Sequence, residues 1–223
     1  MRTSILLLLL LLTACSPSPV AEEKAEATPQ LLPVYIAPAA EERIPQLYRC
    51  AERTQVGLVQ RTPSLRDARI ALRVGAGDDK IAYPIGEVEI GLFANADNPV
   101  EALSREEALA LYTGKIGNWA EVGGDDAPVR LWVYDQDDDL QHAFNESVLG
   151  QNPLSTLARQ APNPRAMRDA IANDAHALGI LPKSQADSRL RPLYSLENLP
   201  VLVILQEEPQ ENLLSLIICL QEK

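Results

Sequence analysis

Residues 98–124 decide the fold of this chain, and they read NPVEALSREEALALYTGKIGNWAEVGG. Ser104 and Glu107 form the pattern of a capping box, in which a hydroxyl and a carboxylate three residues later satisfy free backbone groups at a helix start. The apolar spacing continues through Tyr112, and Gly114 marks the end of the helix. The stretch therefore predicts a helix followed by a glycine-rich turn.

Short apolar runs alternate with amphipathic segments on both sides of this stretch, which favours an α/β fold. Pro45 argues against an unbroken helix over residues 39–54, since an internal proline removes a hydrogen bond, so that helix is expected to start near Ile44. The expected strands cover residues 34–37, 56–59, 69–74, 87–94, 129–134, 178–181 and 201–205. The expected helices cover residues 39–54, 104–114, 140–150, 163–172 and 212–220.

The 98–124 stretch resembles the phosphate-type substrate-binding proteins of ABC transporters. In that family an NP turn precedes a helix beginning L-[ST]-x-E, which ends in [FY]-x-G-K-I-x-N-W and is followed by a glycine pair. Residues 170–182, which run from AIAND to LGILP, resemble the family's V-x-x-x-P-G-A-I-G-Y segment. The two matches cover most of residues 95–185, and residues 31–94 fit only by pattern.

The resemblance implies an α/β, two-lobed periplasmic-binding-protein-like fold of type 2, with lobe one built from both chain ends. Lobe one would comprise about residues 31–94 and 191–223, and lobe two about residues 95–190. Cys50 and Cys219 would then share one lobe, where a disulfide between them would tie the chain ends together. Two unpaired, buried thiols are the alternative, and the sequence leaves both open.

The first fifteen residues have the layout of a bacterial lipoprotein signal. After a positive start, residues 5–12 are apolar without a charge, and Leu12-Thr13-Ala14-Cys15 ends the run. A membrane-spanning anchor is the alternative, but it needs about 20 apolar residues. We expect residues 1–14 to be removed, Cys15 to be diacylated, and residues 15–30 to form a disordered tether. The chain is then a membrane-anchored, extracytoplasmic lipoprotein of a bacterium.

Composition and the absence of known motifs argue against several classes of function. The formal net charge of −11 argues against nucleic acid as a partner, because phosphate backbones are bound by clusters of Lys and Arg. The chain lacks C-x-x-C and its two histidines, His142 and His176, are far apart, so no zinc site is expected. No G-x-S-x-G, G-x-x-x-x-G-K-[ST] or H-E-x-x-H motif occurs in the sequence, which argues against an enzyme, and no cofactor is expected.

The loop at residues 134–140 departs from the family that the chain resembles. Phosphate binders carry Arg and then Ser-Gly-Thr there, whereas this chain carries aspartates. A carboxylate about 4 Å from a phosphate oxygen costs about 4 kcal/mol at an effective dielectric near 20. Three interpretations remain: a helix cap on a protein that has lost phosphate binding, a changed specificity for a cation, amine or metal, and a small-anion site using other loops. The candidate ligand residues of this loop are Asp135, Asp137, Asp138 and Asp139.

Two further loops supply candidate residues for the ligand cleft. The first strand ends at Ala37 and Ala39, and Pro38 between them removes an amide donor. Gly75 and Gly77 either present amides to the cleft or form a plain turn.

Two apolar features have a structural and a functional interpretation. Trp119 and Tyr112 are candidates for a ligand platform, but their places in the motif favour core packing. The run at residues 213–220 is too short for a membrane segment and favours a helix packed in the core.

These patterns predict an extracytoplasmic solute-binding lipoprotein that resembles phosphate ABC transporter substrate-binding proteins. Its expected partners are the membrane, through the lipid anchor, an ABC permease, and a small solute or anion. The aspartates make phosphate itself doubtful as the ligand. A sensor or scaffold lipoprotein that keeps the fold for protein contacts is the alternative, and we expect a monomer in either case.

Overall fold

The computed structural model describes residues 30–75 and 81–222 of the 223-residue chain. Within them one eight-stranded sheet runs through the molecule, in the order β2-β1-β3-β8-β4-β7-β5-β6. Two of its strands, β4 and β8, are much longer than the others. The strands are β1 (Leu31–Ile36), β2 (Leu58–Arg61), β3 (Ile70–Val74), β4 (Ile81–Asn95), β5 (Arg130–Val133), β6 (Arg159–Gln160), β7 (Ala177–Pro182) and β8 (Leu190–Leu205).

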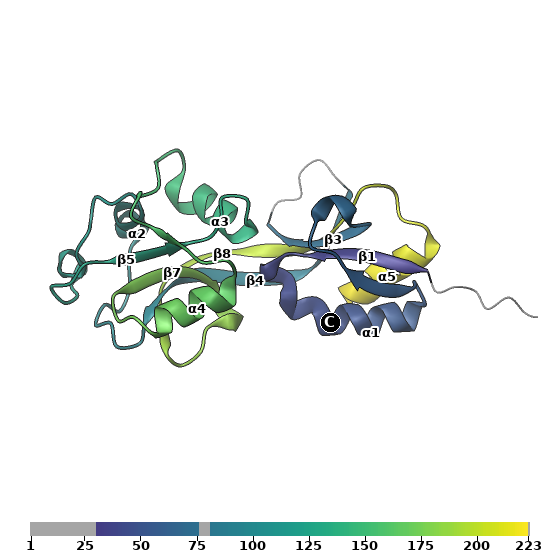
Figure 1. The fold of residues 1–223 in the computed structure, drawn as a ribbon, viewed down its shortest axis with the longest axis horizontal. Helices are drawn as coiled ribbons and strands as arrows, with labels where there is room; N and C mark the ends of the chain where they lie inside the picture. The colour runs from purple at the N-terminus through teal and green to yellow at the C-terminus, as the bar shows by residue number, and fades with distance from the viewer. Residues whose placement is uncertain (1–29, 76–80, 223) are drawn as a thin grey trace, which may run out of the picture.

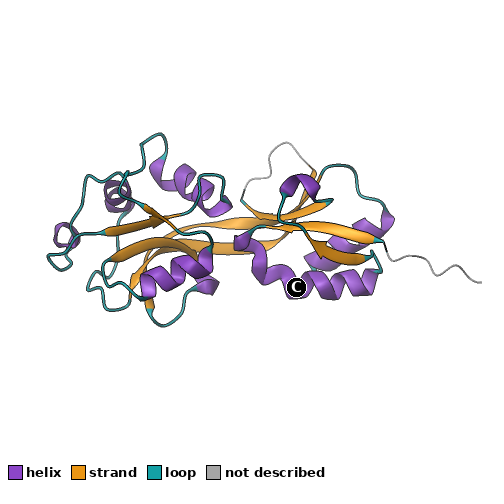
Figure 2. Cartoon of the chain, viewed as in Figure 1, coloured by secondary structure: helices purple, strands orange, loops and turns teal. Residues whose placement is uncertain are grey.

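The helices lie outside this sheet (Figure 2). A 3-10 turn at Pro38–Arg43 precedes the first helix, and a π-helical turn at Asn145–Leu149 follows the third. The α-helices of the described residues are α1 (Ile44–Thr54), α2 (Arg105–Tyr112), α3 (Asp139–Phe144), α4 (Pro164–Ala172) and α5 (Glu211–Gln221).

Two halves share the sheet (Figure 1). The terminal half contains β1, β2, β3, α1 and α5, which come from both ends of the chain, and the central half contains β5, β6, β7, α2, α3 and α4. Strands β4 and β8 pair antiparallel from Ile81↔Leu205 to Asn95↔Leu190 and connect the halves twice. The expected two-lobed α/β fold, with one lobe from both chain ends, is confirmed. The lobe boundaries at 94/95 and 190/191 stay a prediction, because both long strands run through both halves.

Helices α1 and α5 pack together in the terminal half. Leu47 of α1 and Leu216 of α5 are fully buried, and the sulfurs of Cys50 and Cys219 are bonded at 2.01 Å. The apolar run at residues 213–220 is therefore a helix packed in the core, although Ile218 on its outer face remains 53% exposed. No helix within the described ranges is long and apolar enough to cross a membrane.

The helix start in the 98–124 stretch forms as its sequence predicts. The Ser104 N–H donates to the Glu107 carboxylate (2.7 Å), and the Glu107 N–H donates to the Ser104 hydroxyl (3.2 Å). The Ser104 N–H and the Ser104 hydroxyl both donate to the Glu107 carboxylate and lower the pKa of Glu107, because they favour its charged form. Trp119 and Tyr112 are both buried, and the Trp119 indole donates to the His176 carbonyl, which confirms core packing for the two rings.

The two connecting strands are longer than the sequence patterns predict. The expected strands 87–94 and 201–205 are only parts of β4 and β8. Both strands carry prolines and partly exposed residues where they cross between the halves, and β4 shifts register between Pro84 and Gly86. Because of these interruptions, neither β4 nor β8 shows over its full length the regular alternation of apolar and polar residues that predicts a strand. The short strand β6 was not expected either.

Helix α1 begins at Ile44, as Pro45 predicts, because a proline in the first helical turn removes only an amide that has no partner there. The expected signal at residues 1–14, the lipidated Cys15 and the tether at residues 15–30 lie outside the described residues, except for Gln30. Gly77 lies outside them as well.

Candidate functional site

The aspartate loop joins β5 to α3 at the junction of the two halves. Asp138 has extended backbone angles and caps α3, since its Oδ1 accepts the Leu140 N–H at 2.9 Å. Asp135 Oδ1 accepts the Asp137 N–H at 3.1 Å and closes the turn before it. Two of the four aspartates therefore serve the local backbone.

Asp139 instead reaches from the central half to the terminal half. Its Oδ1 accepts the Arg73 Nε–H at 2.9 Å and a second hydrogen bond from the same guanidinium, while its Oδ2 accepts the Val74 N–H at 2.9 Å. The carboxylate is 5% exposed and the Arg73 side chain is 26% exposed. A guanidinium and a main-chain amide are donors that a bound oxyanion would use, and here they hold a carboxylate of the chain itself.

Burial shifts the pKa values of two groups around this contact. Desolvation is the main cause that raises the pKa of Asp138, and the neighbouring Asp139 adds to it, while the hydrogen bond from Leu140 opposes it. Desolvation likewise raises the pKa of Tyr35, with the charge of Asp139 as the second cause. The junction therefore disfavours further negative charge.

A cavity of about 510 Å³ lies beside the Arg73–Asp139 contact, and we call it the junction cavity. Three carboxylates face it with one guanidinium and one imidazole, so at neutral pH its lining is net acidic. Such a lining suits a cationic or amine-bearing solute better than a phosphate dianion. The lining residues are Tyr35, Pro63, Leu65, Arg73, Val74, Gly75, Asp137, Asp139, His142, Ala143, Glu146 and Leu199.

The structure brings together only some of the predicted cleft residues. Gly75, Asp137 and Asp139 line the junction cavity. Ala37 and Ala39 are buried, at 3% and 4% exposure, and are not among its lining residues. Their place in the cleft therefore finds no support in this geometry.

Asp135 lines a different hollow of about 440 Å³ in the central half, beside Tyr134 and Gln141. No group of three or more Cys, His, Asp or Glu side chains within residues 30–75 and 81–222 is arranged to hold a metal ion. The four aspartates, which the sequence places next to one another, thus have separate roles in space.

The sequence search missed Tyr35, Arg73, His142 and Glu146 as residues of this cavity. Arg73 left a readable signal, because it is the only charged residue within the apolar strand Ile70–Val74. A charge in such a strand calls for a buried partner. Which of the distant carboxylates supplies that partner is not visible in the sequence.

The chain is similar to known proteins of the periplasmic-binding-protein type. A family model described as a PBP superfamily domain matches residues 18–215. The phosphate-binding protein PstS of Bacillus subtilis (strain 168) is 26% identical over 102 residues, which is 45% of this chain and 33% of that protein. The match thus spans about one third of the length of that curated relative.

Solved structures similar to the chain include substrate-binding proteins and a regulatory domain. A phosphate ABC transporter substrate-binding protein of Clostridium perfringens with bound phosphate has a TM-score of 0.72 at 18% identity, over 85% of this chain and 92% of that one. An ABC-type phosphate transport receptor from Vibrio cholerae has a TM-score of 0.68 at 14% identity, over 87% and 94%. The CcmR regulatory domain of Synechocystis PCC6803, in complex with 2-PG, has a TM-score of 0.58 at 11% identity, over 86% and 95%.

Proposed function

Because the chain belongs to the PBP superfamily, we propose that it is an extracytoplasmic solute-binding lipoprotein whose ligand is not inorganic phosphate. Its resemblance to phosphate ABC transporter substrate-binding proteins covers the fold and the 98–124 stretch. The proposed anchor is a lipid on Cys15, and the proposed partner is an ABC permease in the same membrane. The proposed ligand is a small amine-bearing solute.

The observation that carries this proposal is the position of the Asp139 carboxylate. It occupies the donors of Arg73 and Val74 and stands where an incoming oxyanion would need them. A phosphate would have to displace this carboxylate and would then lie near it, with the repulsion given above. Asp137 and Glu146 on the same cavity wall add to that repulsion and favour a positively charged group.

A panel of solutes tests the proposal through thermal unfolding of the mature chain. Probes are inorganic phosphate, sulfate, calcium and putrescine, a small diamine. A ligand that binds only the folded state adds about 2.7 kcal/mol of stability at 100 times its dissociation constant. We expect putrescine to raise the unfolding temperature and phosphate to leave it unchanged. Strong stabilisation of the wild-type chain by phosphate would contradict the proposal.

The Asp139→Asn variant sharpens this experiment. It removes the negative charge that repels an external anion and replaces the charge-assisted hydrogen bonds of Asp139 by weaker ones, so we expect phosphate to raise its unfolding temperature. Asp137→Asn is the matched control, since it removes the same charge from the same loop and leaves the Arg73–Asp139 contact in place. A phosphate response in the control alone would show that the Arg73–Asp139 contact does not block the anion.

A sensor or scaffold lipoprotein is the second candidate, and one specific observation favours it. The Arg73–Asp139 contact joins the two halves through groups of the chain itself, so this contact between them requires no solute. X-ray scattering in solution distinguishes the candidates. A scaffold keeps the same dimensions with and without putrescine, whereas a solute-binding protein becomes more compact when putrescine binds.

The anchor is tested separately, by Cys15→Ala in membrane fractions of the host. We expect the variant to leave the membrane fraction, because it carries no lipid. An unchanged amount of the variant in membranes, with normal processing, would place the anchor elsewhere.

A further inference from the structure

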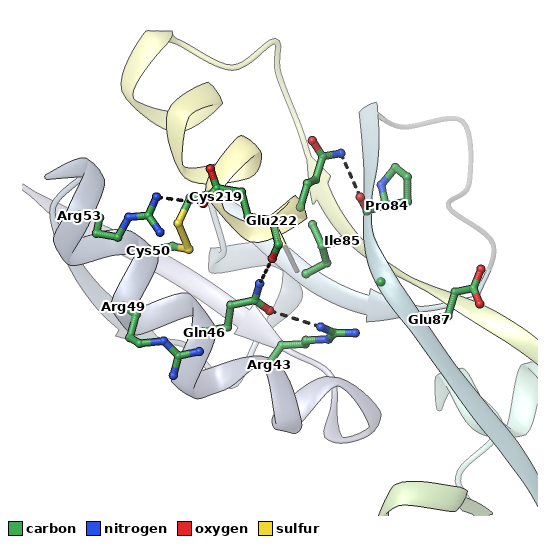
Figure 3. Close-up of a pocket in the computed structure, with 12 residues that line it drawn as sticks. Arg43, Gln46, Arg49, Cys50, Arg53, Pro84, Ile85, Glu87, Cys219 and Glu222 are labelled. Atoms are coloured by element: carbon green, nitrogen blue, oxygen red, sulfur yellow. Dashed lines mark hydrogen bonds and ion pairs between the residues drawn. A yellow bond between two sulfur atoms is a disulfide. The ribbon is translucent and has the colours of Figure 1, made fainter.

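A second hollow lies in the terminal half, away from the junction cavity, and we call it the α1 groove (Figure 3). It has a volume of about 830 Å³. One wall is the face of α1, and the others are the end of α5 and the β4 segment 84–87. The volume lies within the range of about 300–1,000 Å³ that is typical of small-molecule sites.

The floor of the α1 groove is apolar. The Cys50–Cys219 disulfide crosses it, and the buried side chain of Ile85 lies beside Pro84 on the β4 wall. The disulfide holds α1 against α5, and its two cysteines are 3% and 4% exposed. The floor is therefore a rigid surface that an apolar ligand body can cover.

Three arginines line the rim: Arg43, which ends the 3-10 turn before α1, and Arg49 and Arg53 of α1. Arg53 is already paired with the Glu222 carboxylate at 2.9 Å. Arg43 donates one hydrogen bond to Gln46 at 3.3 Å, and its guanidinium packs against the backbone of β4. A Cβ built on Gly86 would meet the Arg43 guanidinium, which shows how closely this side chain lies against the β4 backbone.

Arg49 differs from the other two arginines of the groove. It is exposed, and within the part of the chain that the structure describes it has no hydrogen bond or ion pair. It also stands four residues before Arg53, where like charges on a helix repel. An anion placed beside Arg49 would satisfy its donors and relieve that repulsion.

The acidic residues of the groove do not supply this anion. Glu222 is engaged with Arg53, and the Glu87 carboxylate points away from the Arg43 guanidinium (Figure 3). The chain has a net charge of −11, but the groove is locally basic, because among the described residues the Arg43 and Arg49 guanidiniums have no carboxylate partner. The electrostatics of the groove therefore select for an anionic group.

We infer that the α1 groove binds an organic anion, a carboxylate or sulfonate group carried on an apolar body. The head group pairs with Arg49 and with the remaining donors of Arg43, and the body covers Ile85 and the disulfide. Inorganic phosphate or sulfate alone leaves the apolar floor uncovered and gains only an exposed, water-screened ion pair. This site is independent of the junction cavity and of the ligand proposed for it.

The test uses 8-anilino-1-naphthalenesulfonate, a fluorescent sulfonate with an aromatic body, added to the mature wild-type chain. We expect saturable fluorescence enhancement that decanoate reverses and that decanol and inorganic phosphate reverse poorly. Arg49→Gln weakens the affinity by about three- to tenfold, because one charge-assisted contact is lost. Equal competition by inorganic phosphate and decanoate would overturn the role of the apolar floor.

Two control variants keep the result interpretable. Arg165→Gln removes the same charge from an exposed arginine of α4 in the central half, and we expect no change in affinity. Ile218→Asn removes an exposed apolar side chain of α5, which is one competing place for an aromatic dye. Loss of binding in Ile218→Asn together with unchanged binding in Arg49→Gln would overturn the proposal. Circular dichroism establishes that each variant is folded.

Discussion

Two arginines, Arg73 at the junction cavity and Arg49 at the α1 groove, show opposite uses of the same side chain. Arg73 is partly buried and holds the Asp139 carboxylate, which comes from 66 residues further along the chain. Arg49 is exposed and has no acidic partner among the described residues. An arginine in a hollow is therefore no sufficient sign of an anion site. What decides is whether the fold already supplies the anion.

The rigid floor of the α1 groove is the largest stabilising feature in this comparison. Cys50 and Cys219 are 169 residues apart, so their bond removes much freedom from the unfolded chain. Replacing both by serine should lower the free energy of unfolding by about 4 kcal/mol in urea denaturation. The same loss should follow reduction of the wild-type chain by dithiothreitol. A loss below about 1 kcal/mol would show that helix packing alone shapes the groove.

The junction cavity should respond next most strongly, through Asp139→Ala. Removing one partner of a buried ion pair destabilises a protein by about 3–5 kcal/mol, and we expect the lower end because Arg73 is partly exposed. Urea denaturation measures the change. The control is Asp137→Ala, which removes an exposed carboxylate from the same loop and should change stability by less than about 0.5 kcal/mol. Equal losses in both variants would remove the distinction between the two aspartates.

The helix cap beside that ion pair should have a smaller and pH-dependent effect. The pKa of Asp138 is raised in the folded state, mainly by burial, so the folded chain binds its proton more tightly than the unfolded chain. Stability from this proton is fully present below the ordinary pKa of 3.8 and is lost as the pH rises through the raised pKa. Asp138→Asn keeps a capping oxygen but cannot titrate. The stability of wild type minus that of the variant should therefore decrease with rising pH, as measured by urea denaturation at several pH values.

Arg49→Gln should have the smallest effect on stability. The residue is exposed and repels Arg53 four positions later, so its replacement should change the free energy of unfolding by at most about 0.5 kcal/mol, toward higher stability. The same substitution is expected to weaken binding of the sulfonate dye. A variant that loses several kcal/mol would instead show that Arg49 holds the fold together, as Asp139 does at the junction.

Much of the fold was predictable because its signals are local. The capping box at Ser104 and the helix start at Asn163 each depend on about four consecutive residues, and both form in the structure. The long connecting strands were only partly predictable. Prolines and register shifts at Pro84 and elsewhere interrupt their alternation, and only pairing with the other long strand holds them extended.

The candidate site was predictable as a loop but not as a set of contacts. The aspartates at 135–139 marked the region where this chain departs from the phosphate binders it resembles. Neighbouring residues of a turn point in different directions, so the sequence does not separate Asp139 from Asp138. Arg73 was visible as a charge in an apolar strand, and Arg49 as an ordinary helix charge.

The sequence by itself determined most of the helices and the shorter strands, the family resemblance and the acidic replacement of the anion loop. Each of these features depends on the propensity, periodicity or identity of residues within a short stretch of the chain, and none requires contact between distant segments. Only the tertiary structure decided that Arg73 meets Asp139 and that Cys50 bonds to Cys219. It also decided that Arg49 remains without an acidic partner among the described residues. The physical reason is that these partners lie 66 and 169 residues apart in the chain. They meet only when the shared sheet has brought their elements together.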